Sequence, residues 1–66
     1  MNIDDQISEL RNRRPVRHYG WHITLETHSH KSVLFAHHPI LQSRRHTLRN
    51  PRSDLEVMRF IQSLAR

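Results

Sequence analysis

The C-terminal segment, residues 53–66, constrains the fold of this chain more than any other stretch. It reads SDLEVMRFIQSLAR, and Ser53 followed by Glu56 three residues later has the form of a helix-starting capping box. At about 100° per residue, its apolar side chains spread over more than half of the helix circumference: Leu55, Val57, Met58, Phe60, Ile61, Leu64 and Ala65. A helix docked on one sheet face needs only a stripe about 100° wide. We therefore expect this helix to be covered by a sheet and also by either the N-terminal segment or another chain.

The N-terminal segment predicts a second helix over residues 3–13. Asn2 can cap its start. Its apolar residues recur at helical spacing and form a narrow stripe: Ile3, Ile7 and Leu10. Pro15 ends this helix, because the residue before a proline is pushed out of helical geometry.

The middle of the chain predicts a β-hairpin. Residues 21–26 alternate apolar and polar side chains, which is typical of a half-buried strand. Residues 33–35 form a second apolar run, and the polar stretch between the two suits a loop of three to five residues. Residues 43–49, SRRHTLR, could add a third strand. The expected fold is a small α+β domain over residues 1–66, with the order α-β-β-(β)-α: an N-terminal helix, a β-hairpin or short antiparallel sheet, and a C-terminal amphipathic helix.

Size and composition restrict how such a domain is stabilised. The chain has 66 residues, of which 35% are hydrophobic, so its core is small. It has no cysteine, which excludes disulfides and thiolate metal sites. We therefore expect a homodimer or another partner to supply further stability. No apolar run reaches the length of a membrane span or a signal-peptide core, and we expect a cytoplasmic protein with no membrane association.

Histidine is concentrated in residues 22–38, where it makes up five of seventeen positions. None of the spacings matches a known zinc motif. If Thr27 lies opposite Ser32 in the hairpin, His22 lies opposite His37, and the two could share a metal; a loop that differs by one residue removes this pair. The alternatives are a pH-dependent surface and ordinary exposed histidines. We favour ordinary exposed histidines and expect neither a metal nor a cofactor.

No arrangement of residues predicts catalysis. Four of the six carboxylates lie near expected helix starts, where a structural role explains them: Asp4, Asp5, Asp54 and Glu56. Gly20 is the only glycine, so the chain has no glycine-rich phosphate loop. We expect that the protein is not an enzyme.

Arginine supplies most of the positive charge. The formal net charge is +5, and ten of the eleven Lys and Arg residues are arginine. Most of them fall in two clusters: Arg11, Arg13, Arg14 and Arg17 in the first, and Arg44, Arg45, Arg49 and Arg52 in the second. Arginine binds phosphate through two-point contacts, and the nearby aromatic residues suit base stacking. The clusters predict a small nucleic-acid-associated regulatory protein that contacts phosphates.

A second class of function is compatible with the same sequence. The protein could be a small inhibitor or adaptor, of the kind found as phage or plasmid accessory proteins, that binds an acidic protein surface. Trp21 and Phe60 are then the expected interface residues, because large aromatic side chains are enriched at interfaces. The position of the apolar excess distinguishes the two classes. Burial of the excess in a homodimer leaves the basic surface as the functional one, whereas exposure on a monomer favours a protein partner.

Overall fold

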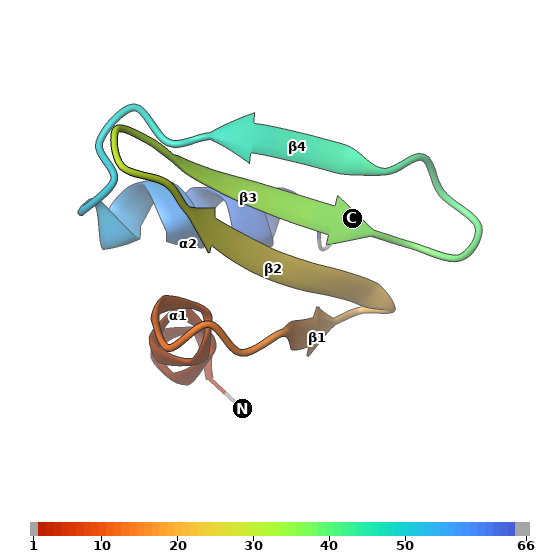
Figure 1. Ribbon diagram of the computed structural model, residues 1–66. Helices are drawn as coiled ribbons and strands as arrows, with labels where there is room; N and C mark the ends of the chain where they lie inside the picture. The colour runs from red at the N-terminus through yellow and green to blue at the C-terminus, as the bar shows by residue number, and fades with distance from the viewer. Residues whose placement is uncertain (1, 65–66) are drawn as a thin grey trace.

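The computed structural model describes residues 2–64 and contains two helices and four strands. In chain order these are α1 (Ile3–Arg11), β1 (Val16–His18), β2 (Trp21–Thr27), β3 (Ser32–His37), β4 (Arg44–Thr47) and α2 (Asp54–Ser63). The strands form one antiparallel sheet in the order β1-β2-β3-β4, and both helices lie on the same side of it (Figure 1). The expected α+β class is confirmed, and so is the third strand. β1 is an additional strand that the sequence pattern did not predict.

Helix α1 starts as expected and ends two residues early. The Asn2 side chain accepts a hydrogen bond from the Asp5 backbone N–H at 2.8 Å, which caps the first turn. At the other end, the backbone N–H groups of Arg13 and Arg14 donate to the carbonyls of Leu10 and Glu9. This is the Schellman arrangement, and Arg13 takes the left-handed conformation (φ 61°) that glycine usually supplies there. The chain therefore leaves the helix before Pro15 can break it.

Strand β1 is joined to β2 by a two-residue turn. Tyr19 and Gly20 both have positive φ, 50° and 84°, as the tightest hairpin turns require. A side chain at Gly20 would also be too close to His38, because a Cβ there would lie 2.9 Å from the His38 ring. The only glycine of the chain thus occupies a position where the positive φ favours glycine and where a side chain would displace the His38 ring.

The β2–β3 hairpin has the register in which Thr27 pairs with Ser32 and His22 with His37. Its loop is residues 28–31, which lies within the expected length, and the His28 N–H donates to the Lys31 carbonyl at 2.8 Å. His22 and His37 are therefore neighbours on adjacent strands, as the sequence predicts for this register.

The core fills the space between the helices and one face of the sheet. It is formed by the residues Ile7, Leu10, Val16, Trp21, Ile23, Leu25, Leu34, Ala36, Leu48, Val57, Phe60, Ile61 and Leu64. The N-terminal segment covers the last helix in this chain, since α1 packs against α2 and both share one core with the sheet. Leu55 remains half-exposed. No helix among residues 2–64 is long and apolar enough to cross a bilayer.

Candidate nucleic-acid interface

Two arginines of the first cluster are held by carboxylates. Arg11 donates from Nε and Nη2 to Oδ1 of Asp54, at 3.1 and 3.0 Å, and from Nη1 to the Pro51 carbonyl. This contact ties the end of α1 to the start of α2, so Arg11 has a structural role. Arg14 lies 3.4 Å from Glu9 in an exposed ion pair.

The other arginines within residues 2–64 have no carboxylate partner at ion-pair distance. They are Arg13, Arg17, Arg44, Arg45, Arg49, Arg52 and Arg59. All seven are exposed. Their guanidinium groups are not neutralised by another side chain of the described fold, which leaves them available to an acidic ligand.

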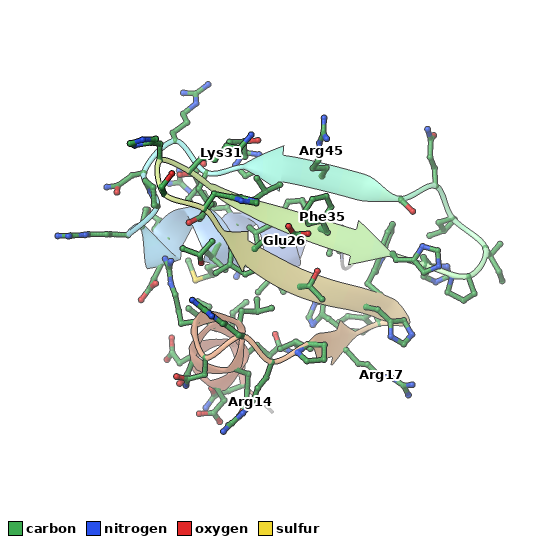
Figure 2. All side chains as sticks on the ribbon, in the orientation of Figure 1. Arg14, Arg17, Glu26, Lys31, Phe35 and Arg45 are labelled. Carbon is green, nitrogen blue, oxygen red and sulfur yellow. The ribbon has the colours of Figure 1, made fainter. Side chains whose placement is uncertain are left out.

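The sheet has one face that no helix covers, and this open face holds two of these arginines. Residues that alternate with the core positions form it: Arg17, His22, Thr24, Glu26, Val33, Phe35, His37, Arg45 and Thr47. The sheet is seen from this side in Figure 2, with α2 behind it. Arg17 and Arg45 lie on the two edge strands, β1 and β4, at opposite sides of the face.

Two histidines, His22 and His37, lie in one row with Arg17 across the open face. His22 pairs with Arg17 on one side and with His37 on the other. His37 Nδ1 is 3.1 Å from the Ser43 hydroxyl. Within residues 2–64 no three side chains of the metal-binding types come together. The pair made possible by the register is therefore a pair of exposed histidines without a third ligand beside it in the described part of the chain.

Next to this row, Phe35 borders a hollow of about 380 Å³. Val33 and Phe35 line it from β3, Arg45 and Thr47 from β4, and His28 and Lys31 from the β2–β3 loop. Phe35 lies directly between Thr24 and Arg45 and keeps part of its side chain exposed. Figure 2 shows Phe35 flanked by Arg45 and Glu26, with Lys31 at the loop end. An apolar surface is thus placed among cationic side chains.

A second basic site is a groove of about 500 Å³ between β4 and α2. Three of the unpaired arginines line it: Arg44, Arg49 and Arg59. Arg44 also donates to the Ser63 carbonyl at 3.4 Å and lies 5.7 Å from the centre of the Phe60 ring. The groove therefore combines free positive charge with contacts that hold the end of α2.

Glu56 is the acidic residue of this groove. Its carboxylate accepts hydrogen bonds from the backbone N–H of Arg49, at 2.8 Å, and from that of Asn50. It also lies 2.7 Å from His46 Nε2. The Arg49 N–H is the main cause that holds the pKa of Glu56 below its ordinary value, and the His46 and Asn50 contacts act in the same direction, against burial. The negative charge of Glu56 is thus compensated locally.

The two arginine clusters of the sequence do not form one surface. The structure distributes them over the open face, the β4–α2 groove and the exposed turns, where Arg13 and Arg52 lie. Sequence reasoning missed Arg59, which comes from outside both clusters and joins Arg44 and Arg49. It also missed Lys31 and Phe35, which the strand register brings beside Arg45. Phe35 could have been identified from the sequence as an aromatic residue at an outward-facing position of a predicted strand.

The residues expected at a protein interface lie in the core instead. Trp21 and Phe60 are 5% and 7% exposed. The Trp21 indole N–H donates to the Leu64 carbonyl at 3.1 Å, and Phe60 stacks on His46. Trp21 is therefore covered by the fold, whereas the small exposed part of Phe60 lines the β4–α2 groove. Within residues 2–64, the large apolar side chains that are exposed are Tyr19, Ile40, Leu41 and Leu55.

No protein-family model, curated protein or solved structure matches this chain.

Proposed function

We propose that this protein is a small nucleic-acid-associated regulatory protein that binds the phosphate backbone through arginines. The observation that carries the proposal is the set of arginines without a carboxylate partner among residues 2–64. If the arginines served mainly to balance acidic residues, most of them would lie at ion-pair distance from a carboxylate. Among residues 2–64, two arginines have such partners, Arg11 and Arg14, and the other arginines of this range face solvent.

The physics of phosphate binding supports this reading. The net charge of +5 attracts a polyanion over several ångströms. Each phosphate that a guanidinium neutralises releases condensed counterions, and this release drives binding. The positions we assign to phosphate contact are the arginines of the two sequence clusters that have no carboxylate partner among residues 2–64: Arg13, Arg17, Arg44, Arg45, Arg49 and Arg52.

Salt dependence tests the proposal. If four or five phosphates are contacted, affinity for duplex DNA should fall with a log–log salt slope of about −4. Between 50 and 200 mM salt, binding should weaken by roughly 10²- to 10³-fold. Arg17→Gln and Arg49→Gln should each flatten the slope by about one unit, because each removes one phosphate contact.

Arg14→Gln is the matched control. It removes the same charge, but Glu9 already neutralises this arginine, so the slope should change less. The measurement is fluorescence anisotropy of labelled DNA and RNA, titrated at several salt concentrations. Absence of binding at micromolar protein in 50 mM salt would refute the proposal.

Several further properties belong to the proposal. We propose that the protein acts in the cytoplasm, without a cofactor and without catalysis. A homodimer is expected from the small core and the absence of cysteine, and the apolar surface of the last helix is a further reason. Helix α1 covers much of that surface within one chain. A dimer would therefore serve nucleic-acid binding by doubling the basic surface rather than completing the core.

One observation favours a protein-binding inhibitor or adaptor as a second candidate. Ile40 is 86% and Leu41 51% exposed in the β3–β4 loop, and Tyr19 is 76% exposed in the β1–β2 turn at the same end of the sheet (Figure 1). Exposed apolar side chains at one end of a small domain are a feature of interaction surfaces. Co-purification from the native host with and without nuclease distinguishes the candidates. A protein retained after nuclease treatment and lost with Ile40→Asp would favour this second function.

A further inference from the structure

We infer that the open face of the sheet binds single-stranded nucleic acid by stacking an unpaired base on Phe35. This inference rests on the proposed function and specifies its ligand. The hollow beside Phe35 supplies the position for the base, and the cations around it supply the phosphate contacts.

The placement of Phe35 is the first step of the argument. Outward-facing positions on β2 and β4 carry polar side chains, namely His22, Thr24, Glu26, Arg45 and Thr47. Phe35 stands among them at the centre of the sheet, on β3, and remains partly exposed. Val33, two residues earlier, is 5% exposed and gives the hollow an apolar wall. A partly exposed aromatic ring beside an apolar wall suits the face of a nucleobase.

The charges around the hollow are the second step. Lys31 and Arg45 both line it, and they come from different segments. Arg45 is directly opposite Phe35 in the β3–β4 pairing, so its guanidinium is within reach of a phosphate attached to a base stacked on the ring. Glu26 on β2 is the nearby acidic residue, and its carboxylate lies 3.4 Å from His28 Nε2. With histidine neutral, Lys31, Arg45 and Glu26 sum to one positive charge.

The form of the nucleic acid follows from this geometry. Bases in a duplex are stacked on each other and present only their edges, so a ring on a sheet surface has no base face to contact. Bases in a single strand can turn outward and stack on aromatic side chains. The open face is therefore suited to an unpaired strand, with Arg17 and the histidine row available farther along it.

Phe35→Leu tests the stacking step. Leucine keeps an apolar side chain in the sheet but has no aromatic face. Affinity for a labelled single-stranded oligonucleotide should fall by about 5- to 150-fold, which is the range for loss of one stacked base. The salt slope should stay unchanged because no charge is removed, and duplex affinity should also stay unchanged. Phe35→Tyr should bind like the wild type, since it retains the ring.

Arg45→Gln tests the phosphate step. It should flatten the single-strand salt slope by about 0.7 units, the value for one contact on a single strand. Glu26→Gln should strengthen binding at low salt, because it removes a carboxylate from the edge of the site. Ile40→Ala, which truncates an exposed apolar residue of the β3–β4 loop, is the control and should have no effect.

The outcomes separate the inference from the proposed function. Binding of single strands and duplexes with equal affinity, unaffected by Phe35→Leu, would overturn the stacking inference and leave phosphate binding in place. No binding to either form would overturn both. If Phe35→Leu does not fold, NMR of the wild type decides: the Phe35 ring resonances should shift on addition of the single strand, and unshifted resonances at saturation would refute stacking.

Discussion

Glu56 shows how one residue can meet a sequence expectation in part and serve a further purpose. Its backbone N–H donates to the Ser53 hydroxyl oxygen at 3.2 Å, as a capping box requires. Its side chain does not bond back to Ser53, as it would in a full capping box. It accepts hydrogen bonds from the backbone N–H groups of Arg49 and Asn50 in the loop before α2. The contact with His46 extends this link to β4. One carboxylate thus joins the last strand, the loop and the last helix.

We predict that Glu56 makes stability depend on acid pH. Its pKa is lowered in the folded chain, so its contribution is present above the unfolded-state pKa and is lost as pH falls through the folded-state pKa. Glu56→Gln should be less stable than the wild type by about 1 kcal/mol at neutral pH, since it loses charge-assisted hydrogen bonds. The difference should shrink as pH falls below the ordinary glutamate range.

Urea denaturation midpoints, measured for both proteins over a pH series, check this prediction. Glu9→Gln is the control because it removes an exposed ion pair with Arg14, which contributes little to stability. A difference between Glu56→Gln and the wild type that persists unchanged into acid would show that the lowered pKa does not contribute.

At the scale of elements, α2 and β1 illustrate the two sources of local structure. The apolar pattern and the Ser53 cap of α2 are encoded within the helix itself, and the structure confirms both. β1 has three residues and no pattern of its own. It exists because Val16 pairs with Ile23 and packs into the core, where it is 4% exposed. A strand of this kind can be predicted only when the strand that it pairs with is known.

We predict that α2 carries much of the stability of the fold. Ile61 is fully buried, so Ile61→Ala should lower the free energy of unfolding by about 2–4 kcal/mol through lost burial and the cavity left behind. Because the total stability of small domains is about 5–15 kcal/mol or less, this loss would unfold a substantial fraction of the molecules at physiological temperature. Chemical denaturation followed by circular dichroism measures the change.

Leu55→Ala serves as the comparison on the same helix. Leu55 is half-exposed, and its truncation should change stability by no more than about 0.5 kcal/mol. Equal effects of the two substitutions would mean that α2 does not pack on the sheet with the face described here.

At the scale of the whole molecule, the core closes within one chain. Both helices cover the same sheet face, and the buried residues form one cluster that runs through α1, the sheet and α2 (Figure 1). The opposite face is left to solvent with a largely polar and basic surface. Antiparallel sheets commonly divide their faces in this way. The division places the core on one face and leaves the other face exposed.

We predict that the free protein melts at a temperature that does not depend on its concentration. An oligomer whose assembly stabilises the fold melts at a higher temperature as concentration rises, whereas a self-contained monomer does not. Calorimetry over about a hundredfold range of concentration makes the test. A rising melting temperature would support the homodimer expected from composition, and Leu55→Asp and Ile40→Asp would then locate its interface.

The sequence by itself determined the elements with a local signal. Periodicity and caps identified both helices, alternation identified β2, and composition ruled out disulfides and predicted a small core. The tertiary structure decided which side chains share a surface. It divided the arginine clusters, buried Trp21 and Phe60, and placed Phe35 beside Lys31 and Arg45. The reason is physical: periodicity acts between near neighbours, whereas strand register and helix docking join distant residues, and one step of register moves a side chain to the opposite face.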